Sequence, residues 1–280
     1  MAHLGENRYG KSRVRVMKVV RHDTHHEMKE WSVRVLLHGD FETCFTEGDN
    51  SRILPTDTMK NTVYWLARES NAGTLEEFAI ELVQYLLGNN PQVSKATAEV
   101  EEKSWKQVFI DGQPHATTYT LTGPELQTTL VTLDRGGEPV VQGGIDGLVI
   151  LKTTNSAFTG YLKDKLTTLP ESTDRIFGTR ATIEWDFSPG ATNFATTRAT
   201  ALSTLLKVFA DHDSLSVQHT LYDMGDAMLK ALPDISQVKL TMPNLHCLLV
   251  DLSRFGQENP NQIFVPIDEP HGYIEAVITR

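Results

Sequence analysis

The chain has 280 residues, with 36 acidic and 26 basic side chains and a net charge of −10 when the histidines are neutral. This length accommodates about two domains, and 40% hydrophobic with 22% charged residues is typical of folded globular proteins rather than disordered ones. The acidic balance argues against a general nucleic-acid or membrane-surface binder, because such proteins neutralise phosphates with basic side chains.

The first half of the chain predicts two strands, two helices and two further strands. Alternating apolar and polar residues indicate half-buried strands, and polar residues between the first two suit a hairpin. Thr74 and Glu77 form a capping box before an apolar helical stripe, which Gly88 is expected to end. The expected elements are strands at 13–21, 31–37, 93–102 and 116–121, and helices at 58–69 and 75–87.

The second half predicts the same order. Its expected elements are strands at 126–133, 147–152, 238–242, 247–252 and 273–279, and helices at 196–210 and 214–232. In each half a proline, Pro91 or Pro233, follows the second helix. We interpret this order as a tandem duplication with domains at 1–136 and 137–280.

Hairpins with helices grouped between them predict an α+β fold of antiparallel sheets with helices on one face. Four helices cannot cover both faces of two broad sheets, and such sheets leave unpaired edges. Closing a barrel across subunits removes both problems, so an oligomer is expected.

A phosphate-loop pattern, GENRYGKS, spans residues 5–12. The loop chemistry requires a buried strand before it and a helix after it, whereas a strand is expected after Ser12. A turn into the first strand is therefore favoured over a nucleotide site. Lys11 stays of interest, because burial can lower the pKa of a lysine enough for it to act as a base.

Three further motifs are open to more than one interpretation. His22, His25 and His26 could hold a metal ion, but a solvated loop is favoured and no metal site is predicted. The glycine-rich segment 142–147 lacks dinucleotide-binding spacing and fits a strand entry or bulge. The polar kink at 243–246 fits either a functional site or a satisfied turn.

Taken together, several segments resemble the urate oxidase (uricase) family over almost the whole chain. The matching motifs, in family order, are YGK at 9–11, PTDTMKNTVY at 55–64, VILKTTNSAF at 149–158, KDKLTTL at 163–169, TDRI at 173–176, SVQHTLY at 216–222, MPNLH at 242–246 and GQENPN at 256–261. Any one motif is weak, whereas their shared order and spacing are specific. The resemblance is to the bacterial type.

The resemblance implies two tunnelling-fold (T-fold) domains per chain and a homotetramer with active sites at subunit interfaces. It further implies oxidation of urate by O2 to 5-hydroxyisourate and hydrogen peroxide, with no metal and no organic cofactor. The protein would then position urate, remove a proton and hold oxygen.

The same resemblance implies roles for individual residues. Arg175 would grip anionic urate, Gln218 and the Val217 backbone would bind the purine, and Phe158 would stack on it. Lys11, Thr56 and His246 would carry protons. Asn244 and Thr56 would hold O2 or peroxide. Asp57 would contribute through its backbone, and Leu169 would line the pocket. Thr56 and Asp57 would come from the neighbouring subunit.

Two alternatives stay open: another T-fold enzyme acting on a pteridine or purine, and a non-catalytic purine-binding protein. Cys44 and Cys247 form no disulfide framework, and a reducing compartment suits them. No targeting or membrane segment is recognisable, so a cytoplasmic protein is expected.

Overall fold

The computed structural model describes residues 2–267 and 269–280, which divide into two compact units. Unit 1 comprises Met1–Gly144 and Asp186–Ala195, and unit 2 comprises Ile145–Trp185 and Thr196–Arg280. The elements of the first half are β1 (Tyr9–Arg21), β2 (His26–Gly39), α1 (Glu42–Thr46), α2 (Thr56–Glu69), α3 (Leu75–Asn89), β3 (Val93–Ile110) and β4 (Gln113–Asp134). Those of the second half are β5 (Val140–Lys152), β6 (Phe177–Phe187), α4 (Phe194–Asp211), α5 (Val217–Ala231), β7 (Ile235–Thr241), β8 (Asn244–Leu249), η1 (Ser253–Phe255), β9 (Phe264–Ile267) and β10 (Glu275–Thr279).

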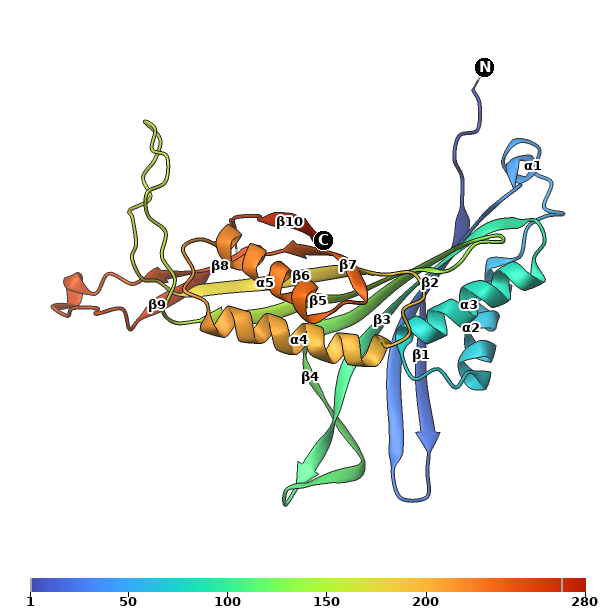
Figure 1. Ribbon diagram of the computed structural model, residues 1–280, viewed down its shortest axis with the longest axis horizontal. Coiled ribbons are helices and arrows are strands. Elements are labelled where there is room, and N and C mark those ends of the chain that lie inside the picture. Colours follow the sequence, from blue (N-terminus) through green and yellow to red (C-terminus); the bar gives the residue numbers. More distant parts are fainter. Residues whose placement is uncertain (1, 268) are drawn as a thin grey trace. The chain divides into compact units, whose positions relative to one another are not determined.

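Unit 1 is an antiparallel sheet in the order β1-β2-β3-β4, with helices packed against it (Figure 1). Helix α3 packs on β3 and β4, and α2 packs on β1. The Thr74 hydroxyl accepts from the backbone of Glu77, and the Glu77 carboxylate accepts from the backbone of Thr74, so the predicted capping box is present. The apolar stripe of α3, including Phe78 and Leu82, is fully buried.

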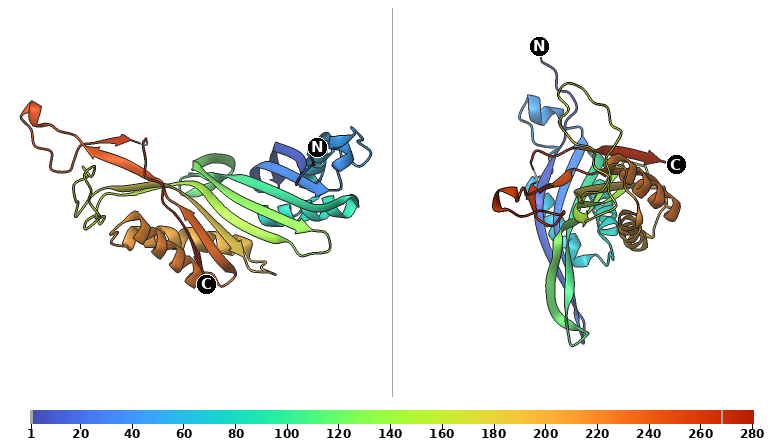
Figure 2. Two further views of the ribbon diagram at one scale, coloured as in Figure 1. Left: turned by 90° about the horizontal axis from the view of Figure 1, so that it is seen from above. Right: turned by 90° about the vertical axis from the view of Figure 1, so that its left-hand side faces the viewer.

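Unit 2 contains the strand order β5-β6-β7-β10, with β8 and β9 branching from β6 as an antiparallel pair. Helix α5 packs on β7 and β10. Helix α4 contacts β6, where the rings of Phe209 and Phe177 lie 5.1 Å apart between centroids. Figure 2 shows α4 and α5 together on one face of these strands.

The predicted α+β class is confirmed, and the first half has the predicted order of strands and helices. In the second half two strands again precede two helices, but they are β5 and β6 and not the expected strands at 126–133 and 147–152. The structure adds the short helix α1 and the strands β6 and β9, and it extends α3 through Gly88. The expected strands at 116–121 and 126–133 are one strand, β4, so the second of them does not begin the second half. The strand expected at 247–252 is β8, which begins at Asn244. The domain boundary at 136/137 stays a prediction.

Strand β4 contains a large bulge that includes Gly123 and Pro124. Lys103 pairs with Leu126 and Trp105 pairs with Leu121, so four residues of β4 lie opposite one residue of β3. A bulge disrupts the hydrogen-bond ladder locally while the strand continues. The two strands expected at 116–121 and 126–133 flank this bulge and are parts of one strand.

Each unit has an unpaired sheet edge within the described residues. Strand β1 pairs with β2 alone, and β10 pairs with β7 alone. Met17 and Val277, on these two strands, expose 60% and 51% of their surface. The sheets are therefore not closed within the chain. No helix in the described ranges is long and apolar enough to cross a bilayer.

A charged cluster crosses three strands of unit 1 around the buried carboxylate of Glu30. One oxygen, Oε1, accepts from Lys103 Nζ and from Arg15 Nη2, both at 2.7 Å. The other oxygen, Oε2, accepts from Trp105 Nε1 at 3.0 Å. The hydrogen bond from Lys103 is the largest cause that lowers the pKa of Glu30 to about 2, and Arg15 and Trp105 act in the same direction.

We predict that Glu30→Gln destabilises the protein at neutral pH by roughly 1–3 kcal/mol, since it leaves charged donors without their partner. The pKa of Glu30 falls from 4.5 to about 2 on folding, so its contribution is present above about pH 4.5 and is lost as the pH falls toward 2. Urea unfolding across this pH range should therefore show a shallower pH dependence in the variant. Glu138→Gln, at an exposed turn, is the control, and equal pH profiles for wild type and Glu30→Gln would contradict the assignment.

Candidate active site

The segment after β5 carries Phe158 and is held by backbone hydrogen bonds. The Phe158 N–H donates to the Ser172 carbonyl at 2.7 Å, and the Ser172 N–H donates back to the Phe158 carbonyl at 3.1 Å. The rings of Tyr161 and Phe158 stack with centroids 4.8 Å apart and an interplanar angle of 13°. The Tyr161 hydroxyl also donates to the Leu169 carbonyl, which ties Leu169 to the same segment.

The Arg175 guanidinium lies over the ring of Phe158, with its central carbon 5.3 Å from the ring centroid. This side chain is half-buried, and burial lowers its pKa from the ordinary arginine value. No carboxylate of the described residues pairs with it. The charge of a half-buried guanidinium is poorly compensated when no counter-ion lies beside it, so this position favours an anionic ligand.

The carboxylate of Asp174 links the segment that contains Phe158 to the segment that contains Arg175. Its carboxylate accepts from Thr154 Oγ1 at 2.8 Å and from the Ser156 N–H at 3.5 Å. The hydrogen bond from Thr154 is the largest cause that lowers the pKa of Asp174. Asp174 therefore points back into its own loop and does not neutralise the adjacent Arg175.

The start of α5 lies against the same segment. Ser214 accepts from the Ala157 N–H at 2.7 Å and donates its own N–H to the Asn155 carbonyl at 3.0 Å. Two residues later, Ser216 caps α5, and its hydroxyl accepts from the His219 N–H at 3.1 Å. The first-turn N–H groups of a helix attract anions.

These bonds bring the predicted residues of α5 to the Phe158 segment. Val217 and Gln218 are the first two residues of α5; Val217 is buried and Gln218 is exposed. The structure thus places one aromatic ring, one unpaired guanidinium and one helix N-terminus in a connected part of unit 2.

Strand β8 carries the other two predicted residues of this unit. Thr179 of β6, which lies four residues after Arg175, pairs with Asn244 of β8. The side-chain oxygen Oδ1 of Asn244 is buried and has no hydrogen-bond partner among the described residues. His246 is half-buried and pairs with Ile267 of β9. The interruption predicted at 243–246 is shorter and lies earlier, because β7 ends at Thr241 and β8 already starts at Asn244.

Lys11, Thr56 and Asp57 belong to unit 1. Lys11 pairs with Val35 and the next pair is Val14 with Val33, so Lys11 lies directly before a bulge. A Cβ at the preceding Gly10 would collide with the Val35 carbonyl oxygen, so glycine is needed for this close strand approach.

The loop before α2 is tied to β1 near Lys11. The Tyr9 hydroxyl donates to the Leu54 carbonyl at 3.1 Å, two residues before Thr56 begins α2. Asp57 accepts from Lys60, which is the main cause of its lowered pKa, and Lys11 contributes in the same direction. The predicted residues therefore form two sets. Lys11, Thr56 and Asp57 lie in unit 1, and the other seven lie in unit 2.

The phosphate-loop pattern at residues 5–12 lacks its helix. A strand and not a helix follows Ser12, as predicted, but β1 begins earlier than expected, at Tyr9, and includes Ser12. The dinucleotide-like segment 142–147 lies inside β5. Gly147 has φ 73°, a conformation that fits a local irregularity of this strand.

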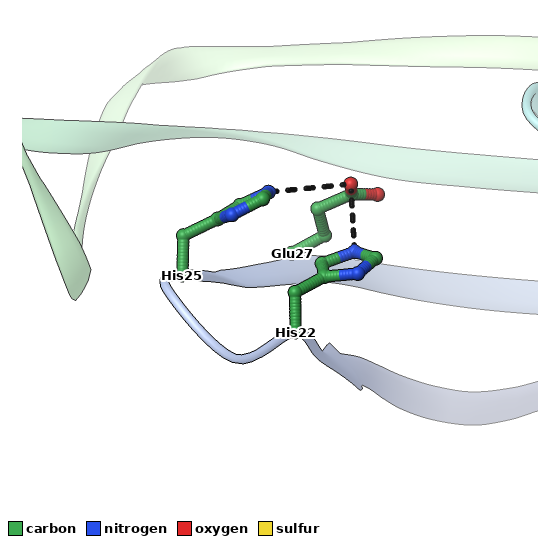
Figure 3. Close-up of side chains that lie close together, drawn as sticks. All are labelled: His22, His25 and Glu27. Carbon is green, nitrogen blue, oxygen red and sulfur yellow. Dashed lines mark hydrogen bonds and ion pairs between the residues drawn. The ribbon is translucent and has the colours of Figure 1, made fainter.

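His22 and His25 of the first hairpin are exposed, as expected, and His26 is half-buried, but the two exposed side chains converge. His22, His25 and Glu27 place their side chains together at the hairpin end (Figure 3). His26 is not part of this group. His212, His219 and Asp223 form a second group of the same kind.

Comparison with known proteins identifies the family of this chain. The sequence model of the Uricase family matches residues 7–132 and 141–275. The chain belongs to the uricase family. It is 40% identical to a uricase of Arthrobacter globiformis over 277 residues, covering 99% of this chain and 90% of the relative, and 36% identical to a uricase of Dictyostelium discoideum over 283 residues, covering 100% and 98%.

A solved structure gives the same fold. The crystal structure of the uricase from Arthrobacter globiformis superposes with a TM-score of 0.94 at 39% identity, covering 100% of this chain and 96% of that one. The resemblance inferred from the motifs is therefore confirmed, and the T-fold architecture with it.

The family motifs contained supporting residues that sequence reasoning did not single out. Tyr9 and Asp174 stand inside quoted motifs, Tyr161 lies between two of them, and Ser214 stands just before one. Their roles depend on hydrogen bonds to residues between 8 and 59 positions away, so no local pattern identifies them.

We predict that Asp174→Ala loosens the Phe158 segment, since it removes the acceptor for Thr154 and Ser156. Amide hydrogen exchange at 156–158 should accelerate about tenfold, the effect of losing roughly one charge-assisted hydrogen bond. Asp174→Asn keeps one acceptor oxygen and should show a smaller effect, while exchange in α3 should not change. Unaltered exchange in Asp174→Ala would show that other bonds hold the segment.

Proposed function

We propose that this chain catalyses oxidation of urate by O2 and water to 5-hydroxyisourate and hydrogen peroxide, without a metal or an organic cofactor. The observation that carries the proposal is the half-buried Arg175, without a counter-ion among the described residues, over the ring of Phe158, whose segment is bonded to the chain just before α5, in a chain of the uricase family. This set of groups suits a flat, anionic ring. Urate as an anion is such a ring.

Urate binding is assigned to the unit 2 residues. Arg175 donates two hydrogen bonds to the anion in the ring plane, a geometry that lysine cannot reproduce. The amide of Gln218 and the N–H of Val217 contact the other side of the purine. Phe158 stacks on the ring face, which requires Arg175 to move aside from its position over that ring. Leu169 lines the pocket.

Proton and oxygen handling is assigned to residues of both units. Lys11 and Thr56 form a proton relay, and His246 passes protons through water. Asn244 and Thr56 hold O2 or peroxide above the ring, and Asp57 contributes through its backbone. The buried, unpaired Oδ1 of Asn244 supports its role, because a buried polar atom without a partner is costly unless a ligand satisfies it.

We further propose a homotetramer in which each active site joins Lys11, Thr56 and Asp57 of one subunit with the unit 2 residues of another. The open edges of β1 and β10, with their exposed apolar side chains, support association through the sheets. A cytoplasmic location is part of the same proposal, and the free thiols of Cys44 and Cys247 are compatible with it.

The decisive experiment follows urate absorbance and O2 uptake together in chelator-treated buffer. Loss of one urate per O2 consumed, with peroxide formed, is expected and should not depend on added metal. Binding of urate or xanthine without O2 uptake would instead indicate the non-catalytic purine-binding alternative. Turnover that needs added metal would contradict the cofactor-free mechanism.

We predict that Lys11→Met and Arg175→Lys separate turnover from binding. Lys11→Met should lower kcat by about 10²- to 10⁴-fold, the usual contribution of general acid–base catalysis, while inhibitor binding persists. Arg175→Lys should weaken binding of purine anions by roughly 1.5–3 kcal/mol, since it loses the two-donor fork.

Mixing the two variants tests the shared site. If each active site combines two subunits, a hybrid oligomer contains some sites with neither substitution. Co-refolding equal amounts of Lys11→Met and Arg175→Lys should then restore about a quarter of wild-type activity by random assortment. No recovery in verified hybrid oligomers would place both residues of each site in one chain.

A further inference from the structure

The end of the β1–β2 hairpin gathers three side chains that the proposed reaction does not use. Nε2 of His22 lies 3.0 Å from Oε1 of Glu27, and Nε2 of His25 lies 3.8 Å from the same oxygen. Figure 3 shows both rings directed at this one carboxylate. All three ligand atoms lie within 4.8 Å of one another.

The hairpin turn fixes this convergence. The His22 N–H donates to the His25 carbonyl at 2.9 Å, and Arg21 pairs with His26 as the last pair of the ladder. The two imidazole rings stack with centroids 4.6 Å apart and 22° between their planes. Both rings therefore project from one side of the turn with their Nε2 atoms toward Glu27.

The second ring nitrogen of His25 also has a partner. Its Nδ1 lies 3.3 Å from Thr24 Oγ1. A hydrogen bond from Nδ1–H to this hydroxyl selects the tautomer whose Nε2 lone pair is available, which is how outer-sphere partners orient metal-binding histidines.

We propose that His22, His25 and Glu27 bind one Zn²⁺ ion, through Nε2 of each histidine and Oε1 of the carboxylate, with water in the fourth position. Tetrahedral bonds of about 2.0–2.2 Å place neighbouring ligand atoms roughly 3.3 Å apart. The observed nitrogen-to-oxygen separations of 3.0 and 3.8 Å bracket this value, and the two Nε2 atoms, which lie within 4.8 Å of each other, would approach to the same distance by rotation of these exposed side chains.

The other histidine group is a weaker candidate for physical reasons. Nδ1 of His212 lies 3.0 Å from Asp223 Oδ2, but its Nε2 is buried and has no hydrogen-bond partner in the part of the chain that the structure describes. A metal at Nδ1 would require a proton at Nε2, and a buried N–H without an acceptor is costly. A neutral His212 that donates from Nδ1 to Asp223 avoids this cost, and burial, which lowers the pKa of His212, favours the neutral form.

This cost of an unsatisfied N–H does not arise at the hairpin, because His22, His25 and Glu27 are exposed and water satisfies any remaining polar atom. The ion would link the end of β1 to the start of β2 across the turn. It would hold the hairpin end in one conformation and would take no part in urate chemistry. This inference is independent of the proposed function.

The test is calorimetric titration of ZnCl2 into the untagged, chelator-stripped full-length protein. One saturable site per chain is expected, and His22→Ala and His25→Ala should each weaken it by about tenfold or more. His26→Ala is the matched control, since His26 lies on the same hairpin with Nδ1 toward Arg21. Its affinity should equal that of the wild type.

Two readouts confirm the location. Co²⁺ should give the visible absorption of a tetrahedral site in the wild type and in His219→Ala, but not in the double variant His22→Ala/His25→Ala. Zn²⁺ should raise the melting temperature of the wild type and of His26→Ala, but not that of the double variant. Absence of saturable binding, retention in the double variant, or equal loss in His26→Ala would overturn the proposal.

Discussion

Two backbone hydrogen bonds at Ser214 determine the arrangement of the candidate site in unit 2. They attach the segment that carries Phe158 to the chain just before α5, whose first residues are Val217 and Gln218. The segment between β5 and β6 has no long element of its own, so its position depends on these bonds and on the Asp174 carboxylate. Arg175 follows Asp174 directly and therefore takes its position from the same contacts.

This support has an electrostatic consequence. Asp174 could have neutralised its neighbour, but its oxygens are used by Thr154 and Ser156. Arg175 consequently stays half-buried without a counter-ion from the described part of the chain, and the segment of Phe158 below it is attached to the chain before a helix N-terminus that also favours anions. The attraction for an anionic ligand is local, and it coexists with a protein whose net charge is −10.

The candidate site residues are distributed over both units, and this gives the unpaired sheet edges a role in the proposed active site. Lys11 lies before a bulge of the edge strand β1, and Thr56 begins the helix that packs on that strand. Strand edges left unpaired in the chain are suited to a second subunit. In the proposed assembly the same contacts that cover these edges complete the active site, so folding, association and catalysis depend on one another.

Local patterns predicted most elements of the fold, because alternation and capping are properties of neighbouring residues. They failed at β4, where a bulge absorbs Gly123 and Pro124, and at β9, which has four residues and pairs with β8 alone. They also failed at β6, although Ile183, Trp185 and Phe187 alternate there and are buried. The turn-rich chain before β6 obscured this signal.

The sequence by itself determined the family, because ordered motifs along the chain carry that information, and the family resemblance named the candidate residues. Only the tertiary structure decided which of those side chains meet, which cation has no counter-ion, and that the hairpin histidines converge on Glu27. The reason is physical: pairing, burial and ligand geometry are set by contacts between residues distant in the chain, and no local pattern of residues records those contacts.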